Sequence, residues 1–248
     1  MGLTHSLTHS LTHSLTHSLT HSLTHSLTHS LTHSHSGFKW IGNKALSLKA
    51  EKVSVLFSYE EALGYCVGDI IADKDGITAA AVFVQMAAEL LEKGLSVHAH
   101  LQTLLMKYGQ FISYNSYVTS HDPIITDKIF ERLRKQGPNG GYWTECGGIK
   151  ILSIKDVTLG YDSTTHNNVS DLPLTPDSHM IMMEFENGCS VTLRTSGTEP
   201  KIKYYTEIAG DPLHPQSRYE LEKKLKIFVD VMVTTMLQPE CNCLLYAT

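Results

Sequence analysis

The pattern of hydrophobic and polar positions divides the chain into two unlike parts. The first part consists of eight consecutive copies of Leu-Thr-His-Ser, from Leu3 to Ser34. A period of four does not match the helical turn of about 3.6 residues, and on a strand Leu and His would share one face. We therefore expect residues 1–36 to be a low-complexity tail, such as an expanded twelve-nucleotide repeat would encode. Metal binding by histidines spaced four apart on a helix is the alternative.

After Gly37, apolar periodicity predicts one strand and two helices. The β-branched run Val53–Phe57 is typical of a buried strand, and a polar turn follows it to Tyr65. Both helices carry capping signals. One follows Asp73–Gly76, reaches Lys93 and stops at Gly94; the other follows Ser96 and places Leu101, Leu104, Leu105 and Tyr108 on one face. A single strand with so few partners indicates part of an α/β domain.

The C-terminal part predicts a helix, a strand, a hairpin, a strand and a final helix. Asp122-Pro123 is a helix start signal, and in the helix that follows Ile129, Phe130 and Leu133 are expected to face inward. Asn187-Gly188 marks the hairpin. The predicted elements are a helix over 123–135, strands over 149–154, 180–185, 189–194 and 201–207, and a helix over 218–238 that ends at Pro239. This order indicates a small antiparallel sheet with helices on one face, so the fold class is α/β and α+β.

Composition excludes several classes of function. A net charge of −5 argues against a broad nucleic-acid surface. The most apolar stretch, Thr78–Leu91, is too short for a membrane span and is interrupted by Gln85 and Glu89. The five cysteines are odd in number, widely spread and without metal spacing, which favours a reduced, cytoplasmic compartment. We expect no nucleic-acid partner and no membrane.

The candidate chemistry lies in the stretch Arg194–Lys203, whose sequence is Arg-Thr-Ser-Gly-Thr-Glu-Pro-Lys-Ile-Lys. A phosphate dianion needs several donors that converge on one point. Ser196 and Thr198 offer hydroxyls, Arg194 offers a bidentate cation and Lys203 a point charge. Gly197 would let main-chain N–H groups turn inward to form an anion-binding nest. On composition alone, an ordinary Ser/Gly/Thr hairpin turn is an equal alternative.

The whole string resembles the phosphate-binding loop in the C-terminal domain of the α-D-phosphohexomutases. Within that family it is similar to the phosphoglucomutase and phosphopentomutase group, to which glucose-1,6-bisphosphate synthase is related. The resemblance implies that the loop holds the non-reacting phosphate of a sugar bisphosphate, and that the partners are hexose or pentose phosphates or the sugar bisphosphate. The residues implied are Arg194, Thr195, Ser196, Gly197, Thr198 and Lys203. It also implies two domains, a remnant of the third domain at 37–118 and the C-terminal domain at 119–248.

A second motif, Glu60-Glu61-Ala62-Leu63-Gly64, contains paired carboxylates that can accept hydrogen bonds from sugar hydroxyls, or form a solvated turn. It resembles the family's sugar-binding loop, Glu-Glu-Ser/Ala-x-Gly. Ala62 favours the phosphopentomutase and phosphoglucomutase branch over the bisphosphate synthase. The stretch Gly37-Phe38-Lys39 similarly resembles Thr-Gly-Phe-Lys, with Ser36 in place of Thr, and would also approach the sugar.

The family's reactive loops are absent from this sequence. By resemblance, these enzymes are isomerases that move phosphate through a phosphoserine in Thr-Ala-Ser-His-Asn/Asp-Pro. They also hold Mg²⁺ with Asp-x-Asp-x-Asp-Arg and use a sugar bisphosphate. Asp73-Lys74-Asp75 is only a pair and serves as a helix cap. The segment from Ser120 to Pro123 shares Ser-His-Asp-Pro but follows the sugar loop, so Ser120 is a disfavoured nucleophile.

The favoured hypothesis is therefore a mutase fragment that keeps the binding loops, binds no cofactor of its own and is inactive alone. A non-catalytic module that binds sugar phosphates or interacts with a mutase is the alternative. A third hypothesis is a poorly folded chain, because half a domain leaves a sheet edge and an apolar face open. Neither the preferred sugar nor the oligomeric state follows from the sequence.

Overall fold

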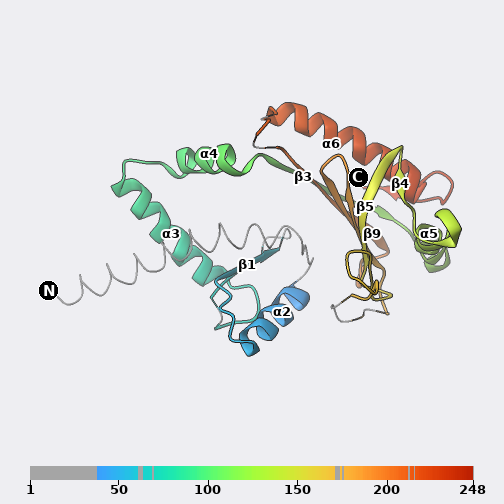
Figure 1. The fold of residues 1–248 in the computed structure, drawn as a ribbon, viewed down its shortest axis with the longest axis horizontal. Helices are drawn as coiled ribbons and strands as arrows, with labels where there is room; N and C mark the ends of the chain where they lie inside the picture. Colours follow the sequence, from blue (N-terminus) through green and yellow to red (C-terminus); the bar gives the residue numbers. More distant parts are fainter. Residues whose placement is uncertain are drawn as a thin grey trace. The chain divides into compact units, whose positions relative to one another are not determined.

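The structure of the protein is a computed structural model. It describes residues 38–60, 64–68, 70–170, 174, 176–211, 213–214 and 216–247, apart from the side chains of Lys39 and Trp40. The Leu-Thr-His-Ser repeat and its expected behaviour therefore lie outside the described residues. The chain forms two compact units, Met1–Leu101 and Gln102–Thr248, and each is described by itself (Figure 1).

The first unit contains a short hairpin and two helices. Helix α2 (Phe38–Ala50) precedes strands β1 (Phe57–Glu60) and β2 (Gly64–Val67), which pair antiparallel, and α3 (Gly76–Glu92) follows. The carboxylate of Asp75 caps α3 by accepting hydrogen bonds from the backbone N–H groups of Ile77 and Thr78 at 2.9 Å and 3.4 Å. The predicted start of this helix is thus confirmed.

The strand predicted over residues 53–57 is wrong. Residues 53–56 are not in a strand, Val53 is 47% exposed, and β1 begins only at Phe57. The pairing that does form uses the segment predicted as a turn, and it brings the rings of Phe57 and Tyr65 to 6.1 Å across the hairpin. Cross-strand aromatic contacts stabilise such a pair without a large core. An apolar run becomes a buried strand only when neighbouring strands cover it.

Helices α3 and α4 (Val97–Tyr108) are mostly exposed. Ser96 caps α4, since its hydroxyl accepts a hydrogen bond from the backbone N–H of Ala99 at 3.1 Å, which confirms the predicted helix. Its predicted inward face does not pack, because Leu101 is 48% exposed. Within α3 the buried side chain is Leu90, whereas Ile77, Phe83, Val84 and Leu91 are exposed. No helix in the described part of the chain is long and apolar enough to cross a bilayer.

The second unit is an antiparallel sheet covered by helices. Its strands lie in the order β10-β3-β9-β8-β7-β5-β4, with β6 paired to β5. The strands are β3 (Phe111–Thr119), β4 (Glu145–Cys146), β5 (Ile149–Asp156), β6 (Tyr161–Asp162), β7 (Met180–Phe185), β8 (Cys189–Thr195), β9 (Lys201–Ala209) and β10 (Leu245–Tyr246). The helices are α5 (Pro123–Lys135), a 3-10 turn η1 (Pro138–Gly140), α6 (Arg218–Met232) and a π-helical turn η2 (Val233–Leu237).

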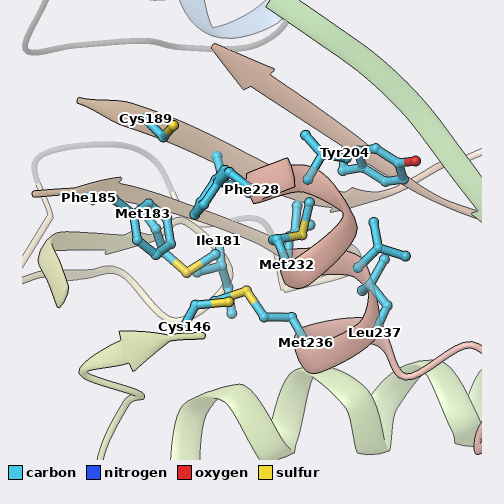
Figure 2. Packing of buried hydrophobic residues seen from close by; sticks show 14 of the residues in the cluster. Cys146, Ile181, Met183, Phe185, Cys189, Tyr204, Phe228, Met232, Met236 and Leu237 are labelled. Atoms are coloured by element: carbon cyan, nitrogen blue, oxygen red, sulfur yellow. The ribbon is translucent and has the colours of Figure 1, made fainter. Parts of the chain in front are cut away.

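Both long helices pack on the same face of this sheet. Buried residues of α5 and α6 join one core cluster with the alternate residues Ile181, Met183 and Phe185 of β7. The intervening Met180 and Met182 form a separate small cluster with Val157. Figure 2 shows side chains of α6 and η2 packed against those of β7, and the rings of Phe228 and Phe185 meet edge to face at 4.9 Å. The predicted antiparallel sheet with helices on one face is confirmed.

Strand β3 was not predicted, yet it pairs with β9 along its whole length, from Phe111 opposite Ala209 to Thr119 opposite Lys201. Its polar residues hide the alternation that marks a strand. Asn115 shows how a polar residue is accommodated in this strand, because its side-chain oxygen accepts a hydrogen bond from the backbone N–H of Thr206 on β9. Such a residue fits a strand only through a contact made by the folded chain.

Candidate functional site

The Arg194–Lys203 stretch forms the hairpin end between β8 and β9. The two strands pair as far as Thr195 opposite Ile202, and the backbone N–H of Ser196 donates to the carbonyl oxygen of Lys201 at 2.9 Å. On the other side, the backbone N–H of Ser120 donates to the carbonyl oxygen of Pro200 at 2.8 Å. The loop is therefore fixed by its own strands and by the end of β3.

Strand alternation places the predicted cations on the face of the sheet opposite the helices. Ile202 and Tyr204 of β9 are buried in the core cluster, so Lys201 and Lys203 point to the other face. Arg194 is directly opposite Lys203 in the register of β8 and β9. Directly opposite residues have Cβ atoms about 4.5–5.5 Å apart, so the two predicted phosphate ligands are neighbours.

Arg194 is held by Tyr205. One terminal nitrogen, Nη2, donates a hydrogen bond to the Tyr205 hydroxyl oxygen at 2.8 Å, and the guanidinium carbon lies 5.1 Å from the centroid of that ring. The Nε–H of Arg194 is buried and has no hydrogen-bond partner among the described residues. A buried donor without a hydrogen-bond partner is costly. Such unpaired donors often occur at sites that bind a ligand.

The two lysines share one carboxylate. Lys201 Nζ lies 2.6 Å from Glu199 Oε1, and Lys203 Nζ lies 3.4 Å from Glu199 Oε2. Hydrogen bonds from both lysines lower the pKa of Glu199, and the hydrogen bond to Glu199 raises the pKa of Lys201. Lys201 Nζ also sits 4.1 Å from the ring centroid of Tyr117 on β3. A ring face attracts a cation, so Tyr117 holds Lys201 in place.

The remaining loop residues differ in their surroundings. The hydroxyl of Thr195 accepts a hydrogen bond from the backbone N–H of His179 at 3.0 Å, so Thr195 ties the loop to the start of β7. Neither Ser196 nor Thr198 hydrogen-bonds through its hydroxyl to another described residue. Gly197 has no left-handed backbone, and a Cβ placed on it would meet open space. Backbone strain therefore does not explain this glycine in the present conformation.

Behind Thr195, His179 connects the loop to a buried ion pair. Arg134 makes two hydrogen bonds to Asp156, at 2.6 Å through Nε and 3.1 Å through Nη2, and a third to His179 Nδ1 at 3.0 Å. A guanidinium only donates, so Nδ1 is the acceptor and the proton lies on Nε2, which is 2.8 Å from a carboxylate oxygen of Asp127. This network fixes the base of the loop against helix α5.

Asp156 is the centre of that network and is fully buried. Besides Arg134, it accepts hydrogen bonds from the Tyr142 hydroxyl at 2.9 Å and from the backbone N–H of Thr158 at 3.0 Å. Burial, together with the nearby Asp156 carboxylate, raises the pKa of the Tyr142 hydroxyl above its usual range. A buried carboxylate is stable only with such a complete set of donors.

The predicted sugar loop lies in the first unit and is only partly described. Glu60 ends β1, is buried, and places a carboxylate oxygen 2.5 Å from Lys74 Nζ, which raises the pKa of that lysine. Phe38 is also buried, and both Phe38 and Lys74 closely surround Gly64. The predicted residues Gly37, Glu61 and Ala62, and the side chain of Lys39, lie outside the described residues.

The weaker candidates have structural partners. Ser120 is buried, and its hydroxyl donates to the carbonyl oxygen of Asp122 and accepts from Thr126 Oγ1 at 2.8 Å, within the start of α5. In the described part of the chain, no group of three His, Cys, Asp or Glu residues could hold a metal ion. Asp75 caps α3, and Asp73 accepts a hydrogen bond from the backbone N–H of Lys74. These residues do not fit an Mg²⁺ site.

Sequence reasoning missed the residues that hold the cations. Lys201 and Glu199 are both part of the Arg194–Lys203 stretch, but their ion pair forms because the turn folds Glu199 back over β9. Tyr205 acts on Arg194 only through the pairing of β8 with β9, and Tyr117 acts on Lys201 only through that of β9 with β3. The signal available in the sequence was the alternation of Lys201, Lys203 and Tyr205, which places all three on one face.

The chain is similar to known proteins over most of its length. Residues 11–108 match the family described as phosphoglucomutase/phosphomannomutase, alpha/beta/alpha domain III. The chain is 42% identical over 210 residues to glucose 1,6-bisphosphate synthase of Homo sapiens, covering 85% of this chain and 34% of that protein. It is 38% identical over 205 residues to human phosphopentomutase, covering 83% and 33%. It therefore spans about a third of the length of these relatives.

Two further similarities agree with these. A probable phosphoribomutase of Schizosaccharomyces pombe is 38% identical over 193 residues, covering 77% of this chain and 33% of that protein. Among solved structures, the open form of the exocytosis-sensitive phosphoprotein pp63/parafusin, a phosphoglucomutase from Paramecium, aligns with a TM-score of 0.51. At 18% identity it covers 80% of this chain and 33% of that one. The last likeness concerns the fold alone.

Proposed function

Because the chain belongs to the α-D-phosphohexomutase family, we propose that the loop between β8 and β9 binds a phosphate group of a hexose or pentose phosphate. The observation that carries the proposal is the pairing of Arg194 with Lys203 on the face of the sheet opposite the helices, at the strand ends that lead into the loop with Ser196 and Thr198. This arrangement offers a phosphate one planar fork, one point charge and two hydroxyls from a rigid hairpin.

The proposed contacts use the properties of each side chain. Arg194 would bind two phosphate oxygens, and the hydrogen bond to Tyr205 holds its guanidinium in position before the ligand arrives. The space beside Gly197 would admit the phosphate, with Ser196 and Thr198 as donors around it. Thr195 belongs to the same site as the anchor that fixes the start of the loop to His179. Preorganised donors bind an anion with little ordering cost.

On the sugar side, we propose that Glu60 accepts hydrogen bonds from sugar hydroxyls and that Lys74 orients its carboxylate. Phe38, together with Gly37, Lys39, Glu61 and Ala62, would complete this surface. The boundaries expected from the sequence, 37–118 for a remnant of the third domain and 119–248 for the C-terminal domain, would divide β3 between the two. Because β3 pairs with β9 along its whole length, we propose that the C-terminal domain begins before Phe111.

We further propose that the chain is a segment of a cytoplasmic mutase and holds substrate without turning it over. Its sequence contains neither the serine loop nor the aspartate triplet of the family, and the described residues do not fit an Mg²⁺ site. The exposed apolar side chains of α3 support the proposal of a segment, since a helix that is apolar on every face is usually buried.

The proposal predicts ligand-dependent stability without turnover. Urea unfolding followed by circular dichroism, at a concentration of glucose 1,6-bisphosphate 100 times its Kd, should show stabilisation by about 2.7 kcal/mol. Incubation with glucose 1-phosphate or ribose 1-phosphate should give no isomerised product. A midpoint that does not move with ligand would reject the binding site. Turnover by the purified chain would reject the absence of chemistry, and a non-cooperative transition would mean that the chain does not fold alone.

Replacing Gly197 by Ala should separate binding from folding. The new methyl group meets open space on an ordinary backbone, so the free energy of unfolding should change by less than about 1 kcal/mol. The methyl group would occupy the space proposed for phosphate, so the affinity for inorganic phosphate should fall by about tenfold or more. Isothermal titration calorimetry measures the affinity and urea unfolding the stability.

The matched control is Gly188→Ala in the β7–β8 hairpin. Gly188 has a φ of 81°, so this substitution should destabilise the chain and leave phosphate affinity unchanged. Equal phosphate affinity in Gly197→Ala and the unaltered chain would contradict the proposed approach of the ligand.

A further inference from the structure

The carboxylate of Glu199 has the position that an anionic ligand of this loop would take. Each of its two oxygens faces a different ammonium group, with Oε1 near Lys201 and Oε2 near Lys203. A hydrogen bond from the backbone N–H of Lys201 to the carbonyl oxygen of Glu199, at 2.7 Å, folds the chain so that this side chain lies over the lysines. A phosphate presents two oxygens to two cations in the same way.

We propose that Glu199 is a built-in counter-anion of the phosphate loop. In the free chain its carboxylate pairs with Lys201 and Lys203, and phosphate displaces it on binding. Glu199 would thereby weaken phosphate binding and keep the release of phosphate fast. This inference rests on the proposed function of the same loop, because it concerns what competes with the ligand.

The charges around the loop give the physical reason for such a residue. Arg194 and Lys203 are directly opposite each other, and Lys201 lies on the same face of β9, so three like charges face one direction. Like charges placed opposite each other destabilise a strand pair. Glu199 offsets this repulsion in the free chain, and a bound phosphate would offset it in the complex.

Glu199 is also able to leave. Its side chain is 42% exposed at the hairpin end, and the contacts described for its carboxylate are those to the two lysines. Water can therefore replace these contacts when the carboxylate swings outward. Lys201 stays in place after the exchange, because the Tyr117 ring continues to hold its ammonium group.

A carboxylate that remained in place would stand beside the phosphate and repel it. Two negative groups at such short range disfavour each other even near the protein surface. Phosphate binding therefore requires Glu199 to move. The loss of its two ion pairs makes the binding free energy less favourable, so the affinity for phosphate is lower. A neutral side chain at this position removes both the competition and the repulsion.

The test compares Glu199→Gln with the unaltered chain, using inorganic phosphate as the probe. The variant should bind phosphate roughly three- to tenfold more tightly at low ionic strength, with slower dissociation, and the difference should shrink at high salt. Glu222→Gln is the matched control, since Glu222 is 45% exposed and pairs with Arg218 on α6. The control should bind phosphate as the unaltered chain does.

Each outcome separates this inference from the proposed function. Phosphate binding by the unaltered chain, with equal or weaker binding by Glu199→Gln and Glu199→Ala, would overturn the counter-anion role and leave the phosphate site standing. Weaker binding would instead mean that Glu199 orders the lysines for binding. Absence of phosphate binding in all variants, with unchanged urea midpoints, would reject the site and this inference together.

Discussion

Replacing Arg134 by Met should destabilise the 102–248 unit by about 3–5 kcal/mol, because the substitution leaves the buried Asp156 carboxylate without its cation. Arg134 and Asp156 expose only 9% and 0% of their side chains, so water cannot replace the lost contact. The variant also loses the hydrogen bond to His179 and the position of the guanidinium near the Phe130 ring. Urea unfolding followed by circular dichroism measures the effect.

The adjacent residue supplies the control for this prediction. Lys135 is also a cation on α5, but its ion pair with Glu131 is largely exposed. Lys135→Met should therefore change the free energy of unfolding by less than about 1 kcal/mol. Combining Arg134→Met with Asp156→Asn should recover part of the loss, because a neutral amide needs no compensating cation and its oxygen can still accept a hydrogen bond from Tyr142 or Thr158. If Arg134→Met and Lys135→Met lowered the free energy of unfolding equally, the buried ion pair between Arg134 and Asp156 would not contribute to stability as predicted.

Elements with a local cause were predictable from the sequence. Helix α5 starts where an aspartate and a proline satisfy the first turn, and the side chain of Asp122 does accept the N–H of Ile124 at 2.8 Å. The β7–β8 hairpin turns where Asn187 and Gly188 allow it. The core stripe predicted for the last helix was also correct, since its residues in α6, from Leu221 to Met232, and Met236 in η2 are buried. In each case neighbouring residues determine the conformation.

Elements with a distant cause were not predictable. Strand β3 exists because β9 lies beside it, and Val53 is exposed because the described residues supply no strand to cover it. The π-helical turn at Val233–Leu237 ends α6 where the sequence suggested an unbroken helix. There Arg132 donates hydrogen bonds to the carbonyl oxygens of Thr235 and Met236 from another helix, a contact that no local pattern reveals.

The candidate site divides in the same way. The Arg194–Lys203 string could be predicted as a phosphate-binding loop because its donors are close together in sequence and the whole string resembles a family motif. The residues that hold this loop in place come from other segments. Tyr117 on β3 contacts Lys201, and the backbone N–H of His179 at the start of β7 donates to Thr195. The buried pair behind the loop joins Arg134 to Asp156, which are 22 residues apart, and their contact depends on how α5 packs on the sheet.

Arg194→Met is expected to weaken binding of inorganic phosphate by about 10- to 100-fold, which is the size of a lost charge-assisted contact. The guanidinium is the planar group of the site and would engage two phosphate oxygens at once. Arg194→Lys should recover only a small part of the affinity, since an ammonium group keeps the charge but cannot form the fork. Calorimetric titration of phosphate into each variant measures these differences.

Two matched variants make this result specific to the position of Arg194. Arg218→Met removes an exposed arginine from α6, and phosphate affinity should stay the same. Tyr205→Phe keeps the ring beneath the guanidinium but removes the hydroxyl that accepts from Nη2, so it should weaken binding by less than Arg194→Met. If Arg194→Met and Arg218→Met bound phosphate equally well, the anion would bind elsewhere, and the arginine would serve only to hold β8 against β9.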